Sequence, residues 1–467
     1  MNKEIMYLEC SFPPDLRKTL VNRIKGKNMP FDLFSEKYLN THLKSSELHK
    51  RAKVVFAGDG ATHFVRIMEP FRPYITHALG SKKWDADGNE YIDYVMGHGA
   101  LLQGHAHPPV VKAIQEQAGK GLHYGGNHEL EVEWAELIQS MVPSAEKVEF
   151  FACGQEANLM AIRLSRAFTG RQKILRFSEN FHGWADELIW PLPSPGALAD
   201  HVRIVDWNLN RLEAELATRK YAILMMEGGG AHMTGQIPFD FDFVREIPGL
   251  ARKYGTVWHL DEVVTGFRDS VGGFQGLANV RPDLTSFGKI IAGGLGAGAL
   301  VGRDEIMGLL SSRTSAEKRV LHSGTWNANP LTAAAGIAAL KSLHDGAPQK
   351  KANELAAYLR KKGNEVLKSN DVQGRLYGRS ITHIYLGPVE SEPTEDIFPP
   401  TKDPLKIVAG KPQKSRFSQY LLQAGIALLA GEMFVLSSAH TSEDVEKTVS
   451  ALEAALPALN PEGRGNR

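Results

Sequence analysis

Cysteine is scarce in this sequence, which has only Cys10 and Cys153 among 467 residues. Two cysteines in so long a chain argue against a disulfide framework and favour a reducing compartment, so we expect a cytoplasmic protein. Apolar runs of about 18 residues are also missing, and we therefore expect no membrane span. The first residues lack the apolar core and cleavage site of a signal peptide.

Neither sign of charge is in excess, because 54 lysines and arginines stand against 53 aspartates and glutamates. Without a basic excess, nucleic acid is not an expected partner. Hydrophobic residues make up 43% and charged residues 23% of the chain, as in ordinary globular proteins. At about 100–200 residues each, two or three structural units are expected.

Short apolar runs alternate with helical patterns in the middle of the chain. Four runs have the length and composition of buried strands: 147–153, 173–177, 221–227 and 256–263. Between the first two, apolar residues at i, i+3 and i+4 predict a helix that ends at Gly170. Strands alternating with helices predict crossover connections, a mostly parallel sheet and an α/β fold.

Changes of composition divide the chain into three parts and a tail. Residues 1–100 contain a helical pattern and a hairpin, and we expect them to pack on the smaller domain. Residues 101–345 are the expected large domain, with the central sheet. Residues 346–460 combine amphipathic helices with an antiparallel strand pair, as in a smaller α/β domain. The polar residues 461–467 are expected to be a disordered tail.

Two residues carry the main functional prediction. Asp261 lies at the end of an apolar run, and Lys289 follows 28 residues later beside Gly288, Gly293 and Gly294. A lysine that forms a Schiff base and a carboxylate that holds the pyridinium nitrogen are the protein groups that a pyridoxal phosphate site needs. Burial would lower the pKa of the lysine and keep its amine neutral. Taken singly, the two residues are ordinary surface and turn residues.

Several further residues follow the predicted strands and are candidates for the same site. Gly154 and Gln155 begin the helix after the first strand, where unpaired N–H groups suit a phosphate. Phe181 and Val263 have the character of side chains that stack on the two faces of a flat ring. His182 is better suited to a supporting hydrogen bond than to acid–base chemistry.

Glu227 ends a predicted strand, at the edge where α/β sheets collect ligands, and is a candidate for substrate or ring contacts. Thr325 offers a hydroxyl to a phosphate, although its segment also has the composition of a plain capping loop. Residues 294–299 fit G-x-G-x-x-A but lack the context of a dinucleotide site. His105 and His107 have no third ligand, so we expect a turn and no metal.

These segments together resemble the class III aminotransferases, which are fold-type-I pyridoxal phosphate enzymes. The resemblance runs from about Arg66 to Ala335 and rests on DEVVTGFR, the spaced GKIIAGG, FHGW, PDLTSFGK and HSGTWNANP. GHGALLQGHAHP and HELEVEWAELI are similar to the glutamate-1-semialdehyde aminomutase branch and its D-phenylglycine aminotransferase-like relatives.

The resemblance implies a fold and residue roles. It implies a large domain with a mostly parallel sheet and a smaller C-terminal α/β domain. Lys289 would form the internal aldimine, and Asp261 would hold the pyridine nitrogen. The ring would lie between Phe181 and Val263, and the phosphate would be held by Gly154, Gln155 and Thr325, the last from the other subunit of a homodimer. Arg66 would bind a substrate carboxylate.

The expected enzyme is an aminotransferase that moves an amino group between an amino acid or amine and a keto acid or aldehyde, by way of pyridoxamine phosphate. The nearest alternative is an intramolecular aminomutase of the glutamate-1-semialdehyde type. A racemase or decarboxylase would use the same electron sink, and a non-enzymatic binding protein would not need Lys289. Gln155, Phe181, Gly228 and Gly296 depart from the usual family residues.

Overall fold

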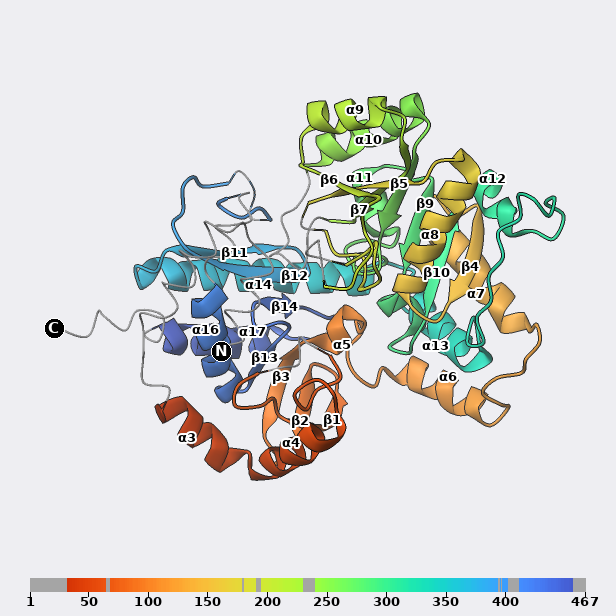
Figure 1. Ribbon diagram of the computed structural model, residues 1–467. Helices are drawn as coiled ribbons and strands as arrows, with labels where there is room; N and C mark the ends of the chain where they lie inside the picture. Colours follow the sequence, from red (N-terminus) through yellow and green to blue (C-terminus); the bar gives the residue numbers. More distant parts are fainter. Residues whose placement is uncertain are drawn as a thin grey trace.

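The structure is a computed structural model that describes residues 32–63, 68–178, 180–189, 195–229, 240–393, 395, 397–401 and 411–456. A large sheet with its helices lies on one side, and two smaller sheets lie on the other (Figure 1). None of the helices in this part of the chain is long and apolar enough to cross a membrane.

The large sheet has seven strands in the order β4-β10-β9-β8-β7-β5-β6. Its strands are β4 (Lys147–Phe151), β5 (Lys173–Phe177), β6 (Val202–Val205), β7 (Tyr221–Glu227), β8 (Val257–Asp261), β9 (Leu284–Phe287) and β10 (Gly298–Gly302). Only β10 runs antiparallel to its neighbours β4 and β9, whereas β9-β8-β7-β5-β6 are all parallel. The mostly parallel sheet and the α/β fold are confirmed.

Helix α8 (Gly154–Thr169) connects β4 with β5 and confirms the predicted helix. Its C-terminal residue Gly170 has φ +69°, a left-handed conformation that glycine adopts without a steric penalty. Its apolar face contacts β4, β7, β9 and β10. The helix therefore begins at the edge of the sheet where the parallel strands end.

Other helices surround the large sheet. They are α6 (Pro108–Ala118), α7 (Glu129–Met141), α9 (Leu209–Ala217), α10 (Phe241–Tyr254), α11 (Gly273–Ala278), α12 (Asp304–Met307) and α13 (Pro330–Lys341), with the short helices η3 (Lys289–Ala292) and η4 (Gly308–Leu310). Helix α13 packs on α6, α7 and η3, and α10 packs on α9 and β8.

The two ends of the described chain share a four-stranded sheet. It has the order β1-β2-β3-β13, where β1 (Ile75–Leu79), β2 (Lys82–Asp85) and β3 (Glu90–Tyr94) are antiparallel. Strand β13 (Ile426–Leu428) pairs with β3 in parallel. Helices α3 (Asp32–Thr41) and α4 (Leu43–Val55) precede this sheet, and α5 (Met96–Gly99) follows β3. Segments more than 300 residues apart in sequence therefore form one unit.

A third sheet contains the predicted antiparallel pair, β11 (Gly374–Gly378) and β12 (Ile381–Leu386), followed by β14 (Met433–Val435). Helices α14 (Ala347–Ser369), α16 (Lys411–Gln423) and α17 (Ser442–Ala455) accompany it. Figure 1 shows α14 running from the large sheet toward the side where the C-terminus lies. One hydrophobic core contains Phe150 of β4, Leu359 of α14 and Phe434, so the parts pack continuously.

The run 256–263 was predicted as one strand, and the predicted end of this strand is wrong. Strand β8 ends at Asp261, and Val263 lies in the turn that follows. The chain turns here because the buried Glu262 carboxylate accepts from N–H groups of Phe274 and Gln275 in α11 and not from the neighbouring strands.

Candidate active site

The predicted site residues follow the carboxyl ends of the parallel strands, which meet at one edge of the large sheet. Gly154 and Gln155 follow β4, Phe181 and His182 follow β5, Glu227 ends β7, Asp261 ends β8, and Lys289 follows β9. Backbone pairing places Glu227 directly beside Asp261 and Asp261 beside Ser286. Five strand ends thus bring together residues that are distant in sequence.

Asp261 is nearly fully buried, at 3% exposure, and its carboxylate accepts three hydrogen bonds. Oδ2 accepts from Asn158 Nδ2 at 2.8 Å and pairs with His182 Nδ1 at 2.8 Å. Oδ1 accepts from the backbone N–H of Val263 at 3.0 Å. A carboxylate has about four acceptor positions, so one position on Oδ1 remains for a further donor.

The charge of Asp261 is maintained by its neighbours. Burial alone would raise the pKa of this carboxyl, but the hydrogen bond and charge of His182, with His259 and the Val263 N–H, hold the pKa below its usual value. His182 is itself buried, and its Nε2 atom has no hydrogen-bond partner in the described part of the chain. His182 thus contacts Asp261, and its supporting role in the site remains a prediction.

Lys289 is the first residue of η3 and has a left-handed backbone conformation, with φ +51°. Such a conformation is unfavourable for a residue with a Cβ and occurs often at functional sites. Burial lowers the pKa of its ammonium group, the charge of Arg268 acts in the same direction, and the charges of Asp261 and Glu227 oppose them. The fold thus makes the neutral, nucleophilic amine more accessible than that of an ordinary lysine.

The N-terminus of α8 lies directly against Val263. A Cβ added to Gly154 would lie 2.5 Å from Val263 Cγ2, and one added to Gly288 would lie 3.1 Å from Val263 Cγ1. Both glycines are therefore needed for the close approach of α8, the turn after β8 and the segment before Lys289. Free backbone N–H groups at the start of a 16-residue helix favour an anion.

Gln155 holds the segment that follows Phe181. Its Oε1 atom accepts from the backbone N–H groups of Trp184 at 2.6 Å and Ala185 at 3.3 Å. Gly183 has φ +137°, and a Cβ there would lie 2.7 Å from the same oxygen. The Gln155 oxygen therefore fixes this loop, while the predicted phosphate contact of Gln155 remains a prediction.

Glu227 and Phe181 are linked through the backbone. Glu227 Oε2 accepts from the Phe181 N–H at 3.0 Å, and the Glu227 N–H donates to Asn180 Oδ1 at 2.8 Å. Glu227 is buried, whereas Phe181 is only half-buried. Phe181 is therefore not a fully buried core residue.

These features fit pyridoxal phosphate at three separate points. The remaining acceptor position on Asp261 matches a protonated ring nitrogen. Val263 leaves no room for a Cβ at Gly154, so α8 begins without a side chain at its first residue, and the backbone N–H groups of a helix start suit a phosphate. Lys289 has the lowered pKa that an amine needs to attack an aldehyde.

Comparison with known proteins decides the family. The sequence pattern of the family described as Aminotransferase class-III matches residues 66–189 and 197–382, which is more than half of the chain. The chain belongs to the class III aminotransferases. It is therefore a pyridoxal phosphate-dependent enzyme of fold type I.

Relatives with two kinds of activity resemble this class III enzyme. It is 36% identical to a glutamate-1-semialdehyde 2,1-aminomutase of Syntrophomonas wolfei, over 88% of this chain and 97% of the relative. The solved structure of an omega-transaminase from Sphaerobacter thermophilus has a TM-score of 0.80 and is 29% identical in sequence. The match covers 89% of this chain and 98% of the transaminase chain. The structure of a β-phenylalanine aminotransferase from Variovorax paradoxus has a TM-score of 0.81 and is 27% identical, over 92% of this chain and 97% of the aminotransferase chain.

Three residues of the class III site were missed from the sequence. Asn158 lies one helical turn after Gly154 and interrupts the apolar face of α8, which was the available signal. Glu262 and Arg268 lie inside DEVVTGFR, and their roles could not be read from that segment. Glu262 and Arg268 are both buried, and the available sequence signal was a charged residue within a stretch of otherwise apolar or small residues.

Glu262 fixes the turn after Asp261. Its carboxylate accepts from the Phe274 N–H at 2.6 Å, the Gln275 N–H at 3.1 Å, Gln275 Nε2 at 3.0 Å and Thr265 Oγ1 at 3.1 Å. Burial raises the pKa of Glu262 to about 7, and these four donors act against that rise. The turn that carries Val263 is thus built on a satisfied buried carboxyl.

The remaining candidates lie away from this cluster or cannot be placed. Thr325 is exposed on the loop before α13, and its carbonyl oxygen is paired with His123 Nε2. Arg66 lies outside the described residues. His105 pairs with Asp93 at 2.7 Å, and no group of metal ligands occurs in the described part of the chain.

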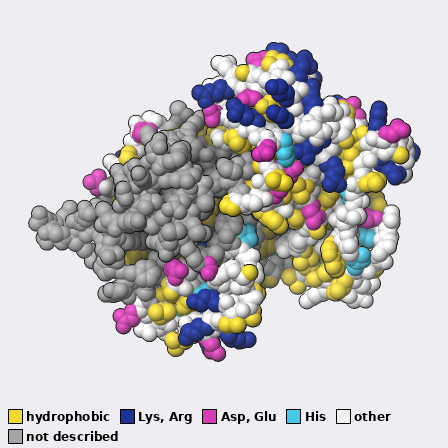
Figure 2. Space-filling model, in the orientation of Figure 1, with side chains coloured by type: hydrophobic (Ala, Val, Ile, Leu, Met, Phe, Trp, Pro, Cys, Tyr) yellow, Lys and Arg dark blue, Asp and Glu magenta, His cyan; other side chains and the backbone are white. Residues whose placement is uncertain are grey.

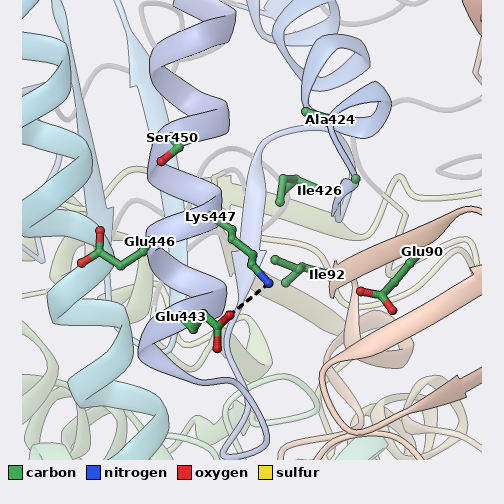
Figure 3. Close-up of a pocket in the computed structure, with 9 residues that line it drawn as sticks. Glu90, Ile92, Ala424, Ile426, Glu443, Glu446, Lys447 and Ser450 are labelled. Atoms are coloured by element: carbon green, nitrogen blue, oxygen red, sulfur yellow. Dashed lines mark ion pairs between the residues drawn. The ribbon is translucent and has the colours of Figure 1, made fainter.

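A separate surface groove of about 480 Å³ lies between α17 and the strands β3 and β13 (Figure 3). Ile92 and Ile426 line it together with the ion pair of Glu443 and Lys447, whose atoms are 3.2 Å apart. Because it contains no residue from the carboxyl ends of the large sheet, it is not part of the candidate active site.

Proposed function

We propose that this enzyme moves an amino group within one small substrate, as an aminomutase of the glutamate-1-semialdehyde type. The observation that carries amino-group chemistry is the buried pair of Asp261, with one free acceptor position, and Lys289, with a lowered pKa. Curated relatives 32–36% identical over almost their whole length are named glutamate-1-semialdehyde 2,1-aminomutase, which supports the intramolecular form.

When bound, pyridoxal phosphate supplies an aldehyde carbon and a ring that accepts the electrons of a broken C–H bond. Lys289 Nζ would hold the cofactor through that carbon and would carry a proton, and burial lowers the pKa of this amine. Asp261 holds the ring nitrogen in its charged form, and His182 and Asn158 orient the carboxylate. Gly154 presents the N-terminus of α8 to the phosphate.

The roles of the remaining residues complete the proposal. Phe181 and Val263 would border the ring, and Gln155 holds the loop after Phe181 through its Oε1 atom, so that its amide nitrogen would be the group available to the phosphate. Glu227 orients the Phe181 segment and limits the site at the end of β7. Arg66 is proposed to bind the substrate carboxylate on the basis of the family resemblance.

Transamination between two substrates is the second candidate. The solved structures at 29% and 27% identity are titled omega-transaminase and β-phenylalanine aminotransferase. Both activities need the same cofactor residues, so the difference lies in whether the first product leaves before the second half-reaction. A substrate kept in place gives a mutase, and an exchanged one gives a transaminase.

We also propose that two copies of the chain form a dimer in which Thr325 reaches the partner's phosphate site. Leu122, Tyr124, Leu321 and Trp326 are all large apolar residues with exposures of 47–66%. The rings of His123 and Trp326 lie 5.5 Å apart, which joins the two loops into one surface. Apolar side chains also gather over α6 on the face shown in Figure 2. A continuous apolar surface of this kind favours a protein partner.

The deciding experiment supplies the pyridoxamine phosphate form with glutamate-1-semialdehyde alone, without amino donor or keto acid. A mutase transfers the amino group from C2 to C1 and gives many turnovers of 5-amino-4-oxopentanoate. A transaminase stops after one half-reaction and resumes only with a second substrate. Lys289→Ala is the control, since it should bind cofactor and give no turnover in either case. Activity only with separate donor and acceptor would reject the mutase proposal.

A further inference from the structure

Four consecutive residues beside Lys289 have left-handed backbone conformations. The φ angles of Met96, Gly97, His98 and Gly99 are +43°, +59°, +59° and +90°. For the two that are not glycine, such a conformation costs on the order of 1–3 kcal/mol each. A Cβ on Gly99 would lie 3.9 Å from Lys289 Cδ. This left-handed segment, Met96–Gly99, therefore forms a wall against which the reactive side chain lies.

The beginning of the left-handed segment is held by Asp93. Its carboxylate accepts from the Val95 N–H at 3.1 Å and the Met96 N–H at 3.2 Å. The same carboxylate is paired with Lys83 at 2.6 Å and His105 at 2.7 Å. Since Asp93 is buried and fully engaged, it cannot move without breaking this network.

The end of the left-handed segment is held by Arg268, which is 1% exposed. Arg268 Nη2 donates to Gly99 O at 2.6 Å, and Nη1 donates to Leu436 O at 3.2 Å, just after β14. In the described part of the chain, no carboxylate lies within ion-pair distance of this guanidinium, and burial lowers its pKa to about 10 against the opposing charge of Asp269. A buried cation with carbonyl partners is costly, and a neutral side chain would fill the space more cheaply, so packing alone does not explain it.

We propose that Arg268 is a positioning residue of the active site, which fastens the left-handed segment and the end of β14 to the loop after β8 and so fixes the wall beside Lys289. This inference rests on the proposed function, because Lys289 is taken as the reacting group. Arg268 acts on Lys289 in a second way, since its positive charge adds to the effect of burial in lowering the pKa of the lysine, against the larger opposing charges of Asp261 and Glu227. The Arg268 guanidinium therefore contacts both the residue after β14 and the segment beside Lys289.

The test separates charge from geometry with two variants. Arg268→Gln removes both, whereas Arg268→Lys keeps the charge but cannot bond Gly99 O and Leu436 O together in a fork. The matched control is Arg171→Gln, because Arg171 also donates to backbone carbonyls, those of Tyr221 and Tyr254, at the far end of the sheet.

The first measurement is the pH dependence of Lys289 acylation in the cofactor-free protein, followed by mass spectrometry. Arg268→Gln should move the midpoint to higher pH, as expected when a nearby cation is removed. Arg268→Lys and Arg171→Gln should leave the midpoint in place. Because this assay needs neither cofactor nor substrate, it reports on Arg268 even if the proposed reaction is never observed.

The second measurement is the rate of the amino-donor half-reaction. Arg268→Lys should slow it by about tenfold, since small displacements of a reacting group have effects of this size or larger. Gly99→Ala should also slow it, because φ +90° disfavours a Cβ while the neighbouring atoms leave space for one. If Arg268→Gln fails to fold, the half-reaction rates of Gly99→Ala and Arg268→Lys decide whether the position of the left-handed segment controls the reaction. Lowered melting temperatures with an unchanged midpoint and unchanged rates would show a merely structural arginine and overturn the proposal.

Discussion

Replacing Asp261 by asparagine is the most informative perturbation of this site. The substitution keeps the shape of the side chain and removes one negative charge from a nearly fully buried position. The carboxylate currently receives donors from Asn158, His182 and Val263. In the variant, an NH₂ group must face at least one of these donors, so we expect a stability loss of about 1–3 kcal/mol.

The effect on catalysis follows from the lost charge. Two opposite charges about 4 Å apart interact by about 4 kcal/mol at an effective dielectric constant near 20. A neutral asparagine recovers about 1 kcal/mol of this through an ordinary hydrogen bond. The difference of about 3 kcal/mol predicts that Asp261→Asn slows the amino-donor half-reaction by about 100- to 1000-fold.

Stopped-flow absorbance of the bound cofactor measures this rate directly. The matched control is Asp283→Asn, because Asp283 accepts from the Trp258 N–H at 2.9 Å and from Arg303 at 2.7 Å, at the opposite ends of β8 and β9. The control should lose stability but keep the rate. A folded Asp261→Asn protein with a rate within threefold of the native enzyme would refute the reasoning.

Three further predictions follow from the same geometry. In the cofactor-free protein, Lys289→Met should have a higher free energy of unfolding than the native protein at pH 7. Urea unfolding should show this difference shrinking as pH rises toward 10.5, because a lysine whose pKa is lowered by folding destabilises the folded state only below the pKa that it has in the unfolded chain. Gly154→Ala should weaken cofactor binding by about tenfold in absorbance titrations, because its methyl group meets Val263. Trp326→Asp should shift sedimentation from dimer to monomer; an unchanged dimer would place the interface elsewhere.

Much of the large sheet could be predicted from local sequence. The runs that became β4, β5, β7 and β8 are short, apolar and bounded by polar residues, and Gly170 marks the end of α8. Strand order was not predictable, because β10 enters between β4 and β9 through contacts distant in sequence. The pairing of β3 with β13 could not be predicted from local sequence either, because these two strands lie more than 300 residues apart in the chain.

The site was predictable where a residue type itself indicates chemistry. Lys289 and Asp261 stood out because an amine and a carboxylate follow apolar strands. Asn158 and Arg268 could not be assigned, because their roles depend on the partners they meet in three dimensions, Asp261 and Gly99 O. The end of β8 was placed two residues late because the buried Glu262 carboxylate bonds the N–H of Phe274 in α11, a partner twelve residues away.

The central claim is that the cofactor is bound covalently by Lys289. Borohydride reduction of the purified enzyme followed by tryptic mass mapping tests it most directly. Trypsin does not cut between Arg281 and Pro282, so a blocked Lys289 leaves the peptide 269–303 intact, and Lys289 is the only lysine in it. We expect the added mass in this peptide alone. Label on a peptide from another part of the chain, or on none, would contradict the account.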